Sequence, residues 1–206
     1  MATNALEICN SALTLVGARR IVSLSDPSLE ARECNANYDI ARKATLRDFP
    51  WNWATKRVVL DTADSTAPAF EYQYRFAIPD DFIRNHTVYD TSACILEAGR
   101  WRLESDFYLT DEATLWVRYV YNVTDTTLFD PIFDEAVAAK LAHKISFKLN
   151  ASESTRAEVA KIYMDCLRRA KFTSSTEEPS EKLDADEWVR SRYGRASDFI
   201  RDPGTN

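Results

Sequence analysis

Apolar residues at the start of the chain recur every three or four positions, which predicts a helix from Asn4 onward. Its apolar face comprises Ala5, Ile8, Cys9, Ala12, Leu13 and Val16. Asn4 and Glu7 form a capping-box pattern, and Gly17 favours an end to the helix. A second helix is predicted to begin at Asp26-Pro27, an N-cap followed by proline, and to stop before Pro50.

From Trp53 the hydrophobic period changes to two, and short aromatic or β-branched runs alternate with turn formers. This pattern predicts an antiparallel meander, with Pro79-Asp80-Asp81 ending its first clear strand and hairpin turns at Ala98-Gly99 and Ser105-Asp106. The predicted strands are 72–78, 85–89, 94–98, 100–103, 107–109 and 115–123.

The helical period returns at Asp130-Pro131, another cap followed by proline. Apolar residues spaced by four run down this third helix to Leu149, and four alanines between positions 136 and 142 keep it slim enough for close packing. After a polar break at 150–152, a fourth helix is predicted, with an apolar period that ends at Phe172.

These elements predict an α+β protein with three parts. Residues 1–53 and 128–172 would form a four-helix bundle-like domain, and residues 54–127 an inserted antiparallel β domain. An extended tail, 173–206, combines an acidic stretch, then a basic one, with spaced apolar anchors such as Trp188 and Tyr193. Such a tail either orders on a partner or straps over the helices of its own chain, and the sequence leaves both open.

Rare residues exclude several kinds of site. The chain has 206 residues, but only four glycines and two histidines, so it lacks a glycine-rich phosphate loop and a multi-histidine metal site. We therefore expect no cofactor and no metal. Cys9, Cys34, Cys94 and Cys166 show no C-x-x-C spacing and are predicted to be small buried hydrophobes of a protein made in a reducing cytoplasm.

Charge and hydropathy exclude further classes. A formal net charge of −6 argues against a protein that binds DNA through its phosphates, and therefore against a small DNA-packaging factor. No stretch has the roughly 18 consecutive apolar residues of a membrane span. The aromatic cluster Phe49, Trp51 and Trp53 lies near Lys56 and Arg57, where stacking on bases is conceivable, but a plug between a helical and a sheet layer is favoured.

The best acid–base candidates are Asp80, Asp81 and His86, where a carboxylate could orient an imidazole. A polysaccharide- or peptidoglycan-cleaving hydrolase that uses them is the alternative function. Pro-Asp-Asp is ordinary turn chemistry, however, and no neighbouring residue is marked as a nucleophile. We therefore predict a non-enzymatic protein with no catalytic residue.

An ordered series of short motifs resembles the podovirus head-to-tail adaptor family, also called tail tubular protein A. The series covers nearly the whole chain, and its order carries the resemblance. Its members are Ala12-Leu13-x-x-Val16-Gly17, Ile21-x-Ser23-Leu24-x-Asp26, Cys34 with Tyr38, Phe49-Pro50-Trp51-x-x-Ala54-x-x-Arg57, Ile78-Pro79-x-Asp81-Phe82-Ile83-Arg84, Tyr119 to Val123, Phe129-Asp130-Pro131-x-Phe133-x-x-Ala136, Tyr163 with Ala170, and Trp188-x-x-Ser191-Arg192.

The resemblance implies a structural virion protein at the head–tail junction, assembled in the host cytoplasm. About twelve copies would form a ring between the portal protein and the tail nozzle protein, around a channel through which DNA is ejected without specific binding. In similar adaptors the C-terminal segment reaches the portal. The resemblance therefore implies that the portal is contacted by Trp188, Val189, Arg190, Arg192 and Tyr193. The inserted sheet is the expected nozzle side, and no membrane contact is expected.

Overall fold

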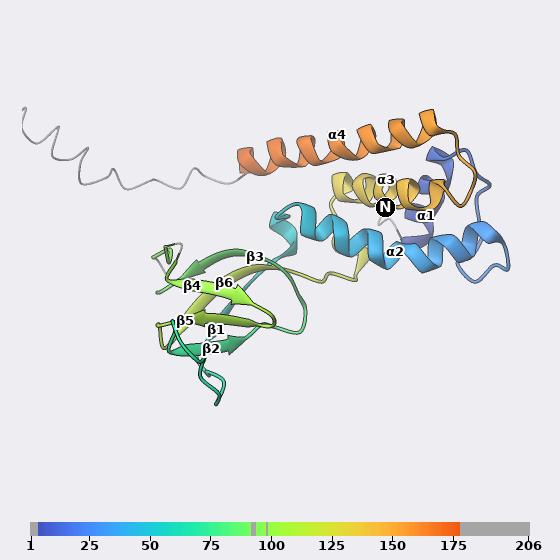
Figure 1. The fold of residues 1–206 in the computed structure, drawn as a ribbon. Coiled ribbons are helices and arrows are strands. Elements are labelled where there is room, and N and C mark those ends of the chain that lie inside the picture. The colour runs from blue at the N-terminus through green and yellow to red at the C-terminus, as the bar shows by residue number, and fades with distance from the viewer. Residues whose placement is uncertain (1–3, 92–93, 98, 178–206) are drawn as a thin grey trace, which may run out of the picture. The chain divides into compact units, whose positions relative to one another are not determined.

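The computed structural model describes residues 4–91, 94–97 and 99–177, which contain four α-helices and six strands in two antiparallel sheets (Figure 1). The α+β class is therefore confirmed. The chain divides into two units, Met1–Ser174 and Ser175–Asn206, and the contacts below belong to the first.

Helix α1, Ala5–Leu15, begins with the predicted capping box. The Glu7 amide donates to Asn4 Oδ1 at 2.9 Å, and the Asn4 amide donates to Glu7 Oε2 at 3.2 Å. The chain leaves the helix through Gly17 at φ +72°, a left-handed conformation that glycine adopts without a Cβ penalty. Both predicted ends of this helix are confirmed.

Helix α2, Leu29–Asp48, begins later than predicted, so the assignment of Asp26-Pro27 as its cap was wrong. The hydroxyl of Ser28 accepts the Ala31 amide at 3.2 Å and caps the helix. Asp26 instead accepts the amides of Val22 and Ser23, each at 3.1 Å, and closes the loop before the helix. The helix ends before Pro50, as predicted, with Phe49 in an extended conformation.

Helix α3, Pro131–Ser146, starts as predicted, because Asp130 Oδ1 accepts the Ile132 amide at 2.7 Å. It ends before Leu149, and Asn150 at φ +55° breaks the path to α4, Glu153–Glu177. The predicted small face is confirmed: Ala136, Ala138, Ala139 and Ala142 are all buried, which lets α1 and α2 pack closely against α3 (Figure 1). Helix α4 adds Val159, Tyr163, Cys166 and Ala170 to the same core.

The strands form two sheets of three, so the predicted meander was wrong. One sheet has the order β1-β6-β3, with β1 at Thr55–Leu60, β6 at Leu115–Tyr121 and β3 at Phe82–Tyr89. The other has the order β2-β5-β4, with β2 at Tyr74–Ala77, β5 at Phe107–Thr110 and β4 at Trp101–Glu104. Among the described strands, β4 and β5 are the only two that are both consecutive and paired, and the predicted Ser105-Asp106 turn joins them. Described residues 94–97 form no strand, so the hairpin expected at Ala98-Gly99 lacks its first arm; Ile95 makes an isolated bridge to Tyr89.

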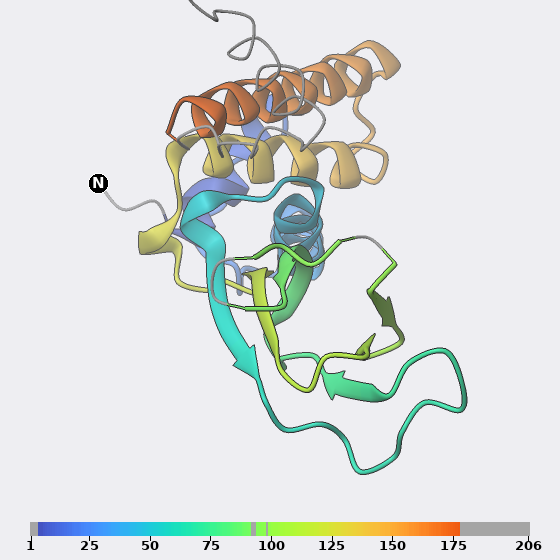
Figure 2. The same ribbon diagram turned by 90° about the vertical axis from the view of Figure 1, so that its left-hand side faces the viewer.

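Two hydrophobic clusters follow this division. The helices, together with Trp51, Val120 and Val123, form one, while the inward faces of the two sheets form the other around Phe76, Tyr108 and Val117. The chain passes from α2 into β1 and returns from β6 into α3 (Figure 2). The end of α2, the start of β3, the end of β6 and the start of α3 meet at one place, the helix–sheet joint.

Candidate functional site

The aromatic residues around Pro50 fill the helix–sheet joint. Trp51 is only 3% exposed, its indole Nε1 donates to the Thr45 carbonyl at 3.0 Å, and its ring contacts Phe133 with centroids 5.0 Å apart. Trp53 lies 5.0 Å from Phe133 and 5.5 Å from Phe129, measured between ring centroids. The predicted plug is confirmed, because rings packed edge to face against each other in a core leave no open face for a base.

Arg42 of α2 is among the largest side chains that are almost completely buried in the described structure, with an exposed fraction of 2%. Its guanidinium donates to Asn122 Oδ1 at 2.8 Å and to the carbonyl of Val123, just beyond β6. Asp39, one turn earlier on α2, accepts at 3.1 Å and balances the charge. A buried arginine is tolerable only when its donors are satisfied, so these bonds hold α2 against the end of β6.

A second pair of arginines ties α2 to β3. Arg47 Nη1 donates to the Ile83 carbonyl at 2.7 Å, and Arg84 Nη1 donates to the Arg47 carbonyl at 3.0 Å. The last carbonyls of a helix have no partner within the helix, and cations near that end also complement the helix dipole. Arg84 therefore caps α2 from the sheet side of the joint.

Asp48, the last residue of α2, joins three helices. Its Oδ2 accepts from Lys140 Nζ of α3 at 2.9 Å and from Tyr163 OH of α4 at 2.6 Å. Partial burial opposes ionisation of Asp48, but these two donors outweigh it and lower its pKa. Burial and the adjacent carboxylate raise the pKa of Tyr163, so its hydroxyl keeps the proton that it donates. The position of α4 is thus fixed at the joint by a polar contact as well as by packing.

The acid–base candidates serve other contacts. Asp81 Oδ2 accepts from Lys56 Nζ at 2.6 Å, and Oδ1 accepts from Tyr119 OH at 2.8 Å. Burial raises the pKa of Asp81, but these donors outweigh it, and the pKa is lowered overall. A lowered pKa suits a permanent ion pair rather than a general acid. Asp80 lies on the surface, in the turn before β3.

His86 lies in β3, where Arg118 Nη2 is 2.6 Å from Nε2, and Thr87 Oγ1 is 2.7 Å from Nδ1. Because a guanidinium can only donate, Nε2 accepts and the proton resides on Nδ1. The imidazole is thereby held by the sheet, and the bonds of Asp81 lead to β1 and β6 instead. Asp81 and His86 thus make separate structural contacts, and Asp80 is exposed in the turn before β3.

Other features concern surfaces and thiols. A groove of ≈ 510 Å³ lies between α1, α3 and α4, and Ile8, Leu15 and Ile162 form part of its lining.

Cys9, Cys34 and Cys166 are buried as predicted, but Cys94 is exposed, so the prediction for this cysteine was wrong. It lies in a short loop beyond β3, which the prediction had treated as a strand.

The residues predicted to contact the portal, Trp188, Val189, Arg190, Arg192 and Tyr193, lie outside the described residues. No family model matches this chain, and no curated protein matches it either. Across 4–91, 94–97 and 99–177, no group of three or more histidine, cysteine or acidic side chains is placed to hold a metal ion. Within the same residues no helix has the length and hydropathy to span a membrane.

The sequence predicts the aromatic plug but not the polar contacts of the joint. Nothing in the local sequence marks Arg42 or Asp48 as different from other charged residues of an amphipathic helix. The one available signal is that Arg42 follows the apolar Ala41 and falls four residues after Tyr38, on the face that α2 buries. A charge at such a position requires partners supplied from elsewhere in the chain.

Proposed function

We propose that this protein is a structural virion component, a head-to-tail connector. About twelve copies form a ring between the portal protein and the tail nozzle protein, around a channel through which the genome leaves. In this proposal residues 1–53 and 128–172 are a four-helix bundle-like domain, residues 54–127 are an inserted β domain, and residues 173–206 supply the C-terminal tail. The first five residues of this last segment, 173–177, belong to α4 and are not extended. The protein acts by assembly and has no catalytic role.

The observation that carries the proposal is the ordered series of adaptor-like motifs together with the positions of their residues. Trp51 and Phe133 belong to two of these motifs, and their rings touch in the joint. Asp81 and Tyr119 belong to two others and share a hydrogen bond. Motifs far apart in the sequence therefore meet in space, as expected when they preserve one architecture rather than occur by chance.

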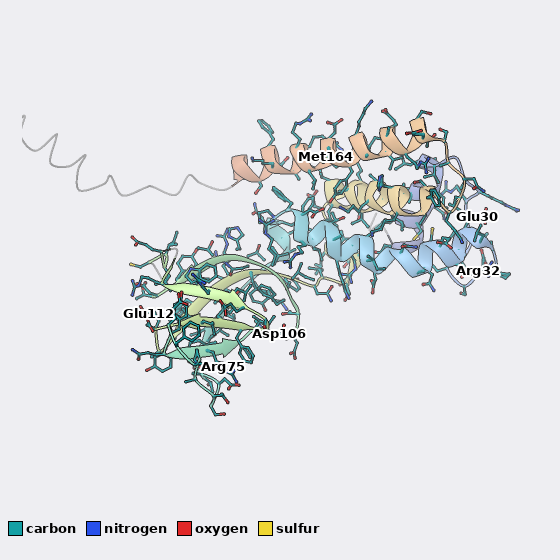
Figure 3. The ribbon with its side chains drawn as sticks, in the orientation of Figure 1. Glu30, Arg32, Arg75, Asp106, Glu112 and Met164 are labelled. Atoms are coloured by element: carbon teal, nitrogen blue, oxygen red, sulfur yellow. The ribbon has the colours of Figure 1, made fainter. Side chains whose placement is uncertain are left out.

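A connector has to transmit force between two larger assemblies without coming apart. The joint supports such a role, because a packed aromatic plug, a buried arginine and an ion pair between α2 and α3 all connect elements across it. Interfaces in rings are heterologous, so each copy presents two different surfaces to its neighbours. The groove between α1, α3 and α4, and the exposed Met164 of α4 (Figure 3), are apolar surfaces available for such contacts.

The portal side of the connector is assigned to the tail. Trp188, Val189, Arg190, Arg192 and Tyr193 would be ordered on the portal, and the burial of their apolar groups would offset the entropy lost on ordering. The net charge of −6 lets DNA pass along the channel without being held, because only clustered cations neutralise phosphates. The virion is thus the proposed location, with assembly in the host cytoplasm.

The test is sedimentation velocity of the purified chain with and without the portal protein of the same virus. We expect the chain alone to be monomeric and to assemble into a ring only on the portal, because premature closure would compete with ordered assembly. A chain that shows no binding to the portal would refute the function. A stable ring without a partner would refute only the proposed order of assembly.

A truncation tests the tail. Because α4 continues to Glu177, removal of residues 178–206 leaves every described helix and strand intact. Circular dichroism of this variant should retain the helical and sheet signals, while docking to the portal is lost. If the variant is unfolded, the tail instead stabilises its own chain as a strap.

A further inference from the structure

Strand β1 forms one edge of the β1-β6-β3 sheet. Its six residues pair with β6 in one unbroken register, from Thr55 opposite Val120 to Leu60 opposite Leu115. In Figure 2 this strand, the long cyan arrow, lies at the boundary of the sheet, with no ribbon of the described residues along its outer side. An edge strand exposes a row of main-chain donors and acceptors that can pair with another chain.

The register identifies the main-chain groups of β1 that face outward. The Val88 carbonyl of β3 accepts an amide of the loop beyond that strand at 2.8 Å, so the main chain of Val88 faces away from β6. Val117, directly opposite, therefore faces β1 and bonds to Val58. Because this direction alternates along a strand, the amides and carbonyls of Arg57 and Val59 face outward. No described residue outside the β1–β6 ladder bonds to them.

The other three sheet edges are covered or short. On the far side of β3 from β6, Tyr89 forms a bridge with Ile95 of the following loop. In β2 the Arg75 carbonyl accepts the Asp64 amide at 2.8 Å. Strand β4 has only four residues. Covering segments and short strands are two ways in which proteins prevent unwanted pairing at a sheet edge.

Strand β1 lacks the remaining protective features, which are a proline, a bulge or a lysine that guards the edge. Thr55–Leu60 contains no proline, and its register with β6 has no shift. Its one lysine, Lys56, is engaged within the chain: Nζ donates to Asp81 Oδ2 at 2.6 Å and lies 4.0 Å from the ring centroid of Tyr121. The outer edge of β1 is therefore open to a further strand.

The side chains beside this edge indicate the chemistry of an added strand. Arg57 and Val59 lie on the same face of β1, where Val59 is 41% exposed and its partner on β6, Trp116, is 36% exposed. Arg57 is exposed and forms no ion pair with any other described residue. Opposite charges, and apolar residues, stabilise a strand pair when they lie directly opposite each other. A complementary strand thus has a carboxylate opposite Arg57 and an apolar side chain opposite Val59.

We propose that the outer edge of β1 binds an extended segment of a partner protein as an additional antiparallel strand. The main chain of the segment bonds to Arg57 and Val59, while an acidic and an apolar side chain, two positions apart, lie opposite them. Antiparallel pairing is the more stable kind, and every described strand pair is antiparallel. A second copy of β1 is a poorer partner, because Thr55–Leu60 carries two cations and no carboxylate. This binding does not rest on the connector role.

Fluorescence anisotropy with a labelled seven-residue peptide tests the proposal on the full-length chain. In the peptide, valine, glutamate and valine at the second, fourth and sixth positions alternate with threonine. We expect saturable binding that weakens by at least about tenfold when the glutamate amide is N-methylated, because that amide faces β1. N-methylation of the threonine that follows the glutamate is the matched control and should leave binding unchanged, because its amide faces away.

Two variants of the chain test the same contacts. Val59→Pro removes an outward amide that the β1–β6 ladder does not use, and proline is tolerated on an edge strand when its nitrogen faces solvent. It should lower the affinity at least about tenfold, while Val59→Thr, which keeps the amide, should bind like the wild type. Arg57→Glu should bind the peptide at least about tenfold more weakly, and a peptide with lysine in place of glutamate should restore the affinity. Circular dichroism checks that each variant is folded.

Several results would overturn the proposal. They are absence of binding to a folded wild-type chain, equal binding of the peptide methylated at the glutamate amide, and wild-type affinity in a folded Val59→Pro variant. Self-association of the wild type that disappears in Val59→Pro would show that a second copy occupies the edge instead. Because none of these measurements contains the portal, their failure leaves the connector role to be judged by its own experiment.

Discussion

Replacement of Arg42 by methionine probes the helix–sheet joint most sharply. Methionine keeps the apolar stem of the arginine and removes the guanidinium, so the change isolates the polar contacts from the packing. The variant loses the donors to Asn122 Oδ1 and to the Val123 carbonyl, together with the ion pair to Asp39. Both acceptors at the end of β6 are left without this donor.

The expected cost follows from these contacts. Each buried acceptor that loses its partner costs about 1–3 kcal/mol, whereas Asp39 is 67% exposed and its ion pair contributes little after solvent screening. We therefore expect Arg42→Met to lower the free energy of unfolding by about 3–5 kcal/mol. In a chain of this size that corresponds to a fall of roughly 10 °C in Tm.

Urea unfolding measures this cost when it is followed both by circular dichroism and by tryptophan fluorescence, to which Trp51 and Trp53 of the joint contribute together with three other tryptophans. Arg32→Met, at an exposed position on the same helix, is the matched control and should change stability by less than about 0.5 kcal/mol. Asp39→Asn should cost less than about 1 kcal/mol. A loss below about 1 kcal/mol in Arg42→Met would refute the reasoning, because the joint would then not depend on these bonds.

Four further predictions concern single features. The pKa of Asp48 is lowered in the folded chain, so the ionised carboxylate stabilises the fold above the ordinary carboxyl pKa of about 4, and this stabilisation is lost as the pH falls below it. The urea midpoints at pH 7 and pH 3 should therefore differ less in Asp48→Asn than in the wild type. Ser28→Ala should lower the free energy of unfolding by about 1 kcal/mol, and no loss would contradict its assignment as the cap of α2. Ellman's reagent should titrate one thiol, Cys94, in the native chain and four in guanidinium chloride. Alanine at Asp81 or His86 should alter thermal stability without removing any polysaccharide- or peptidoglycan-cleaving activity, and an activity that disappears with both would favour the hydrolase alternative.

Helix positions were largely predictable, because their signals are local. The capping box at Asn4 and the Asp130-Pro131 start each act within a few residues, so the sequence alone identifies them. The start of α2 was missed for an equally local reason. Asp26 and Ser28 both have capping side chains, and the choice between them depends on the loop amides of Val22 and Ser23, which Asp26 binds instead.

Strand pairing was less predictable, because it depends on contacts between distant segments. Hydrophobic periodicity located most of the strands. However, β6 pairs with β1, which lies more than fifty residues earlier, and no turn sequence between them predicts this pairing. Once β6 lies between β1 and β3, Arg57 and Arg118 become neighbours. Such neighbours on a sheet face come together only in the folded chain.

The joint combines both situations. Its aromatic residues were visible as a cluster around Pro50, and their burial follows from size and hydrophobicity. Its polar bonds join α2 to the end of β6 and to α3 and α4, across 80 or more positions of the sequence. Such partners are set by the tertiary fold and leave no spacing pattern.

The proposed connector role requires the chain to dock on a portal. Sedimentation velocity with the portal protein of the same virus tests it most directly. We expect a monomer of 23.5 kDa for the chain alone and a portal-bound ring of about twelve copies in the mixture. Independent sedimentation of the two proteins at micromolar concentrations, with both folded, would contradict it.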